Sequence, residues 1–208
     1  MPTRTTTPER RKITAAEKLV EAAALVFARD GLSSATTREI ARTAGVNEVT
    51  LFRNFQTKQN LLAAVLEKAF ERKSNPLAEK FDTLPEDAPL REVITAFAEA
   101  DYASLKQNVS LMRVLVGEIQ KFEEYEMKVL RAIFRPRRDE LTKRLRDAQD
   151  RREVLADIDP MIVVDQLVGM IFTHVLKSDC PFKLEYNQDH YVRACVDLIV
   201  RGISSPIK

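Results

Sequence analysis

The sequence has little of the chemistry on which enzymes and metal sites depend. It contains two histidines, two cysteines, five glycines and no tryptophan in 208 residues. The lone cysteines, Cys180 and Cys195, form neither a disulfide framework nor a zinc-binding pattern. The histidines, His174 and His190, belong to no metal-spaced cluster, and no nucleophile elbow is present. We therefore expect no enzymatic activity, no cofactor and no metal site.

Long apolar runs are also missing. No segment has the uninterrupted length of a membrane span, and the first residues lack the apolar core of a signal peptide. This predicts a cytoplasmic protein with no membrane partner. With 45% apolar residues, the chain can bury a good core, as one domain or as a small domain fused to a larger one.

Charge of one sign is not in large excess, since the net charge is +2. The distribution is uneven, however. Residues 1–60 hold ten Lys and Arg against six Asp and Glu, which leaves 23 against 25 for residues 61–208. A modestly basic head on a slightly acidic body is typical of a protein that docks one end on phosphates.

Apolar residues recur at helical spacing, and no alternating strand pattern or fixed repeat appears, so we predict an all-α fold. Three prolines indicate that 74–89 is a connecting segment, which can hold a short helical turn. Pro136 should bend or split its helix. Outside the segment 36–58, helices are expected at 14–30, 57–73, 90–107, 109–119, 122–149, 160–177 and 188–203.

The segment 36–58, TTREIARTAGVNEVTLFRNFQTK, has the pattern of a helix-turn-helix. Thr36 and Glu39 have the spacing of a capping box, and Gly45 supplies the left-handed residue that ends a helix. Asn47 is a suitable N-cap for the next helix. Such a unit presents the start of its second helix to the DNA major groove, although a purely structural helical hairpin has a similar pattern.

Residues 13–73 resemble the DNA-binding domain of TetR-family transcriptional regulators. The match rests on a long amphipathic helix before the motif and on two runs, Gly45-Val46 to Thr50-Leu51-Phe52 and Phe55-x-x-Lys58-x-x-Leu61-Leu62. The family usually has tyrosine at the position of Phe52 and often histidine at that of Asn54. The phosphate contact that this tyrosine hydroxyl commonly makes is therefore absent here.

The motif and the resemblance together predict which side chains contact a double-stranded DNA operator. Arg38 can reach a guanine edge or a phosphate, and Val49 can contact a thymine methyl group. Glu48 can accept from cytosine N4, or else only stabilise its own helix N-terminus. Lys58 is expected at a phosphate. The full predicted set is Thr36, Thr37, Arg38, Asn47, Glu48, Val49, Thr50, Phe52, Arg53, Asn54 and Lys58.

The segments 160–177 and 188–203 are apolar around most of their circumference, so each must be buried on two sides. A second copy of the chain would cover them in a four-helix bundle, as the resemblance also implies; the alternative is that both are interior to a monomer. A homodimer would recognise an inverted repeat. The predicted interface consists of Val164, Val168, Ile171, Val175, Val192, Val196 and Ile199.

The resemblance further implies a small-molecule effector held among the helices of the larger domain. Aromatic and methionine side chains at helical spacing are candidates, although ordinary core packing explains the same pattern, and His174 equally suits a hydrogen-bonded core position. The candidates are Phe97, Tyr102, Met112, Val116, Phe122, Tyr125, Met127, Met170, Phe172 and His174.

The expected organisation is a basic tail at 1–12, a DNA-binding domain at 13–58, and a ligand-binding and dimerisation domain at 59–208. The tail is either disordered or a basic arm that orders on DNA. The resemblance implies a homodimeric repressor that a small molecule releases from a palindromic operator. Two alternatives stay open, a redox-sensing regulator that uses Cys180 and an all-α protein-interaction module.

Overall fold

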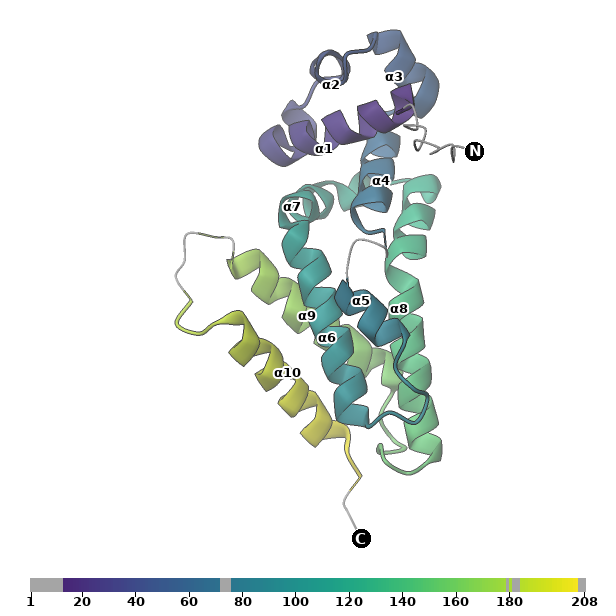
Figure 1. Ribbon diagram of the computed structural model, residues 1–208, viewed down its shortest axis with the longest axis vertical. Coiled ribbons are helices and arrows are strands. Elements are labelled where there is room, and N and C mark those ends of the chain that lie inside the picture. Colours follow the sequence, from purple (N-terminus) through teal and green to yellow (C-terminus); the bar gives the residue numbers. More distant parts are fainter. Residues whose placement is uncertain (1–12, 72–75, 179, 181–183, 206–208) are drawn as a thin grey trace, which may run out of the picture. The chain divides into compact units, whose positions relative to one another are not determined.

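The computed structural model describes residues 13–71, 76–178, 180 and 184–205 (Figure 1). The predicted tail at 1–12 lies outside this range. Within it the fold is all-α, and its β-structure is limited to one isolated bridge between Val154 and Ser204. The chain forms two compact units, which divide between Val65 and Leu66, inside a helix. This division lies seven residues beyond the boundary at 58/59 that the sequence predicts.

The first unit contains α1 (Ala15–Ser34), α2 (Thr37–Ala44), α3 (Glu48–Phe55) and the first part of α4 (Lys58–Ala69). Each helix contributes at least one fully buried apolar side chain to the core; examples are Phe27, Ile40, Leu51 and Leu62. The apolar face of α1 packs against both α2 and α3. Helix α1 thereby supports the helix-turn-helix formed by α2 and α3 from one side.

Polar side chains cap several helices of this unit. Thr14 and Glu17 form a complete capping box at the start of α1, which the sequence analysis did not identify. Gly31 takes a left-handed φ of 74°, which interrupts the helical conformation near the predicted end, but the segment continues to Ser34.

The turn between α2 and α3 is built as the sequence predicts. The Thr36 hydroxyl accepts from the amide of Glu39 at 3.1 Å, Gly45 ends α2 at φ 67°, and Asn47 caps α3. The expected second half of the capping box is wrong, because the Glu39 carboxylate pairs with Arg42 at 2.8 Å instead.

The second unit is a bundle around α6 (Leu90–Gln107). This helix contacts α5 (Pro76–Asp82), α7 (Val109–Glu118), α8 (Glu124–Asp150), α9 (Pro160–Ser178) and α10 (Gln188–Ile203), and a short 3-10 turn, η2 (Ile119–Lys121), follows α7. Its apolar residues, among them Ile94, Phe97 and Tyr102, are almost completely buried. Figure 1 shows α9 and α10 side by side, and they are in contact.

Pro136 does not split its helix. One continuous helix, α8, runs from Glu124 to Asp150 through the proline. Proline removes one backbone hydrogen bond, but α8 packs against both α6 and α9, and this packing favours a single rod. The alternative of two separate helices is therefore wrong.

The helix α9 is long and apolar enough to cross a membrane by length and composition, so the expectation that no segment has that length is wrong. Here it packs against α6, α8 and α10 within the bundle.

The predicted dimer interface needs correction. All of its side chains are buried inside their own chain, so a partner subunit cannot reach them: Val164, Val168, Ile171, Val175, Val192, Val196 and Ile199. Helices α9 and α10 both pack on α6 and on each other, and these side chains belong to the interior of the bundle. Their large exposed apolar side chains are Met161, Ile162 and Leu198.

Candidate nucleic-acid interface and ligand cavity

Three predicted DNA-contacting side chains project into solvent from the helix-turn-helix. Arg38, on the first turn of α2, has 89% of its side chain exposed. On α3, Val49 is 72% exposed and Phe52 is 48% exposed, although both are apolar. Exposed apolar side chains beside a guanidinium suit the edges of base pairs, where methyl groups and acceptors alternate.

Glu48 joins the two helices of the motif. The Thr37 hydroxyl donates to its Oε1 at 2.5 Å, and the Nε of Arg38 lies 3.9 Å from its Oε2. Both partners belong to α2, whereas Glu48 begins α3. The carboxylate is therefore placed to hold the two helices together and to orient Arg38, while it also stabilises the start of α3.

Several other predicted DNA contacts make local hydrogen bonds. The oxygens of Thr36 and Asn47 accept from backbone amides as helix caps. The Asn54 amide donates to the carbonyl of Thr50, one turn earlier on α3, at 2.7 Å. Arg53, on the same helix, is exposed. These bonds use the polar groups of Thr36, Asn47 and Asn54 within their own helices, and Phe52, Arg53 and Asn54 are all exposed on α3.

Lys58 does not have the free ammonium group that a dedicated phosphate contact requires. Its Nζ donates to the carbonyls of Leu32 at 2.8 Å and Ala35 at 2.9 Å, at the end of α1. Those carbonyls lack helical partners, so the lysine satisfies them and neutralises the negative end of the helix. The first role of Lys58 is to tie α4 to α1.

The second unit contains a cavity of about 500 Å³. Helices α6, α7, α8 and α9 all contribute to its mostly apolar lining, which includes four of the predicted residues, Met112, Val116, Met127 and Phe172. Its volume is in the range of sites that take small organic molecules.

The remaining predicted pocket residues do not line this cavity. Phe97 is in edge contact with Phe81 in the core, and Tyr125 is exposed. Phe122 and Met170 are also absent from the lining. Tyr102 and His174 form a buried, hydrogen-bonded pair. Aromatic residues at helical spacing thus mostly serve as core, as the alternative interpretation stated.

His174 is a hydrogen-bonded core residue. Its Nδ1 lies 3.0 Å from the Tyr102 hydroxyl, and its ring stacks on Tyr191 with 3.9 Å between centroids. Burial lowers the pKa of His174, and Lys106 and Lys177 lower it further. These effects favour the neutral imidazole.

Asp101 lines the cavity and was not predicted. Its Oδ2 is buried and has no hydrogen-bond partner among the described residues. Burial raises the pKa of Asp101 to about 6, against the opposing effect of Arg138 and Arg137. The sequence contains a signal for this residue, because Asp101 falls at i+4 from Phe97 and i−4 from Leu105, in the apolar stripe of α6.

Comparison with known proteins identifies the family. Residues 19–65 match the model described as "Bacterial regulatory proteins, tetR family", and residues 82–199 match "Tetracyclin repressor-like, C-terminal domain". The second match alone covers more than half of the chain. The chain belongs to the TetR family. It is a DNA-binding transcriptional regulator of that family.

The chain is also similar to nucleoid occlusion factors along most of its length. The nucleoid occlusion factor SlmA of Aliivibrio fischeri strain MJ11 is 27% identical over 183 residues, which cover 84% of this chain and 90% of the relative. SlmA of Vibrio cholerae is 26% identical over 190 residues, covering 87% and 93%.

Two solved structures share the fold. A tetR-family regulatory protein from Rhodococcus RHA1 has a TM-score of 0.73 at 18% identity, with 93% of this chain and 99% of that chain covered. FadR from Bacillus subtilis, solved in complex with stearoyl-CoA, has a TM-score of 0.68 at 18% identity, with 89% and 98% covered.

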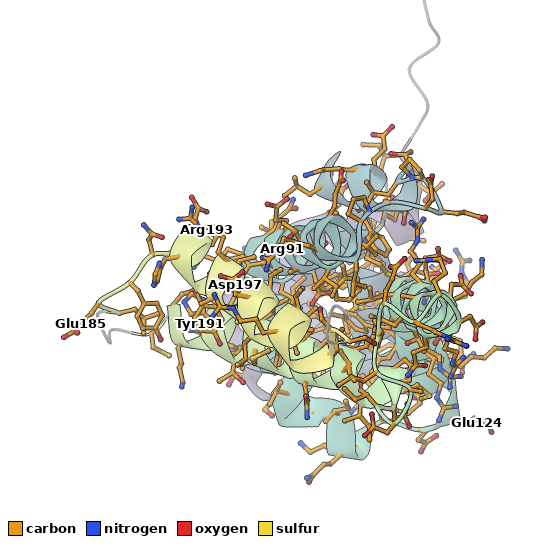
Figure 2. The ribbon with its side chains drawn as sticks, turned by 90° about the horizontal axis from the view of Figure 1, so that it is seen from below. Arg91, Glu124, Glu185, Tyr191, Arg193 and Asp197 are labelled. Carbon is orange, nitrogen blue, oxygen red and sulfur yellow. The ribbon has the colours of Figure 1, made fainter. Side chains whose placement is uncertain are left out.

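This TetR-family chain has a second, more polar cavity of about 540 Å³, which lies between α5, α6 and α10. Arg91 of α6 forms an ion pair with Asp197 of α10 beside it, and Figure 2 shows these side chains directed toward each other. The pair is partly exposed, so its contribution to stability is small.

The thiols have ordinary surroundings. The Cys180 thiol donates to the carbonyl of Leu176 at 3.3 Å, and its sulfur lies 3.8 Å from Nη2 of Arg113. Cys195 is buried, which raises the pKa of its thiol. Sensing of oxidants by Cys180 stays a prediction that a Cys180→Ser variant can test.

Proposed function

We propose that this TetR-family regulator is a cytoplasmic homodimeric repressor. It binds an inverted-repeat operator and leaves it when a small molecule occupies the cavity of the second unit. The observation that carries the proposal is the exposed group of Arg38, Val49 and Phe52 on a helix-turn-helix that is otherwise fixed by caps and core packing. A rigid, solvent-facing set of this kind is what direct base recognition requires.

Exposed apolar side chains on α9 and α10 support the homodimer. Met161 and Ile162 of α9 and Leu198 of α10 are each more than half exposed. Two such surfaces can cover each other across a two-fold axis. The two DNA-binding units would then meet half-sites about 34–36 Å apart.

A chain of contacts leads from the cavity to the helix that both units share. Phe134 of α8 lines the cavity, and its ring packs edge-on against Phe70 with centroids 5.1 Å apart. Phe70 directly follows α4, whose last carbonyl, that of Ala69, accepts from the Asn108 amide at 3.1 Å. A ligand that displaces Phe134 would therefore act on the end of α4.

The start of α4 carries Lys58, which holds two carbonyls at the end of α1. Because α4 is one continuous helix, a shift at Phe70 can reach the first unit through Lys58. Release requires that the ligand bind the displaced state more tightly than the DNA-bound state.

The proposal can be tested by selecting bound fragments from the source genome and measuring affinity for the recovered site. We expect an inverted repeat bound by two chains, with affinity that falls steeply as salt is added. Binding by a single chain, or to a site without two-fold symmetry, would contradict the homodimer.

A second candidate function is nucleoid occlusion, the activity named for the SlmA relatives. It is favoured by the length of that match, which covers 84% of this chain at 27% identity. The same genomic selection separates the two: a repressor yields one or a few sites beside genes, whereas a nucleoid occlusion factor is expected to yield many sites spread along the chromosome.

A further inference from the structure

The chemistry of the cavity around Asp101 limits which molecules it can bind. Oδ2 of Asp101 is buried and lacks a hydrogen-bond donor among the described residues. A buried acceptor without a partner destabilises the folded protein. Asp101 also lines a small cavity of about 30 Å³ with Ser104 and Arg137, where one water molecule fits. It also lines the large cavity, where a bound molecule can supply the donor.

The charges that line the large cavity act against a cation. Arg131, Arg135 and Arg138 of α8 recur at helical spacing and so share one face of the helix. None of these guanidinium groups forms an ion pair within the described part of the chain. The carboxylates of Asp101 and Asp165 line the same cavity, so its three positive charges exceed its two negative charges by one. This surplus disfavours a cationic ligand, and an anionic group beside Asp101 would face the aspartate carboxylate.

An uncharged donor avoids both conflicts. The rest of the lining, including Leu115, Phe134 and Phe172, is apolar and suits a hydrocarbon body. We propose that the cavity binds an apolar molecule with a neutral hydroxyl group, which donates a hydrogen bond to Oδ2 of Asp101. The hydrogen bond to Asp101 does not depend on the proposed function. Only the statement that the bound molecule is the effector rests on it.

The test compares ligands of one chain length in calorimetric titrations of the full-length protein without DNA. Decanol can donate a hydrogen bond, decyl methyl ether can only accept one, and decyltrimethylammonium carries a positive charge. We expect decanol to bind about tenfold more tightly than the ether, because a hydrogen bond to a charged group is stronger than a neutral one. The ammonium compound should bind more weakly than either.

Two variants locate the effect. In Asp101→Leu the preference for the alcohol over the ether should fall below about threefold. Asp165→Asn changes another aspartate of the same lining, on α9, and should keep the full preference. If Asp101→Leu does not fold, Asp101→Asn replaces it, and a reduced preference is expected because its amide oxygen is a weaker acceptor.

Equal binding of alcohol and ether by the wild type would overturn the inference. It would indicate that a water molecule in the small cavity donates the hydrogen bond to Oδ2 of Asp101. Tighter binding of the ammonium compound, loss of the preference only in Asp165→Asn, or no binding of any ligand would also overturn it. DNA affinity is measured separately. Decanol that binds through Asp101 without releasing DNA would contradict the proposed ligand response and leave the hydroxyl site intact.

Discussion

The two units of the chain use their polar side chains in different ways. In the first unit, Thr14, Thr36 and Asn47 satisfy helix termini, and Lys58 satisfies carbonyls of another helix. In the second unit, Asp101 is half-buried at a cavity, and its buried Oδ2 has no hydrogen-bond donor among the described residues. Polar groups that are fully satisfied locally make a rigid surface for DNA. A buried group left without a donor beside a cavity makes a site that a ligand can complete.

The largest effect is expected from Lys58→Met, which retains the aliphatic stem but removes two charge-assisted hydrogen bonds. We expect the first unit to lose about 3 kcal/mol of stability, because the Leu32 and Ala35 carbonyls lose their donor. DNA affinity should fall for specific and random sequences alike. Denaturant unfolding followed by probes in each unit would measure the loss.

A contrary result for Lys58 is easy to recognise. If stability of the first unit is unchanged while affinity for all DNA declines, the lysine acts mainly on a phosphate, as the sequence alone suggested. Arg53→Met is a matched control, since Arg53 is exposed on α3 and should leave stability unchanged.

Arg38→Ala should weaken the specific site by about 1–3 kcal/mol and random DNA much less, because a guanidinium contributes most where it contacts a base edge. Glu48→Gln should produce a smaller loss at the same site, since the amide orients Arg38 less well. Electrophoretic mobility shifts on both DNAs would measure this. Equal losses on both DNAs would make Arg38 a phosphate contact.

Asp101 should make the free energy of unfolding depend on pH between its unfolded and folded pKa values. Asp101→Asn should remove this dependence. The carboxyl has a pKa of about 6 in the folded state and an ordinary value of 3.8 when unfolded, so between these values the folded state binds the proton more tightly. The contribution of Asp101 to stability therefore falls as pH rises through this window, by about 1–3 kcal/mol.

Urea titrations of both proteins at pH 4, 5, 6 and 7 measure this difference, and the other titrating groups cancel in the comparison. A wild type and a variant whose stabilities change in parallel would show that Asp101 is solvated or paired in solution.

The smallest effect is expected at a cap. Thr36→Ala removes the oxygen that accepts from the Glu39 amide and should cost about 1 kcal/mol. Thr37→Ala at the next position removes instead the hydroxyl that bonds Glu48, so it should alter DNA affinity more than stability. Thermal unfolding of the pair measures the difference, and identical melting shifts would contradict it.

Local signals accounted for most of what could be predicted. The caps at Thr36 and Asn47 and the left-handed Gly45 depend on residues within four positions of one another, so the helix-turn-helix was predictable from the sequence. The bounds of α6 and α7 likewise follow from apolar periodicity and from Pro89 at the start of α6.

The errors concern interactions between distant segments. Periodicity shows that α9 and α10 are apolar nearly all round, but not which side packs on α6, and the predicted interface was therefore placed on the buried side. The bond from Lys58 to Leu32 joins residues 26 positions apart. A single aspartate such as Asp101 is ordinary in a surface helix, and only its place in the apolar stripe distinguishes it.

The most direct test of the account is a hydroxyl-radical footprint of the wild type on a selected genomic fragment. We predict two protected segments, related by two-fold symmetry and about 10 base pairs apart, and their loss in a Val49→Asp variant that is folded as judged by its melting curve. Protection that persists in Val49→Asp, or that covers the fragment uniformly, would contradict recognition through the exposed face of α2 and α3.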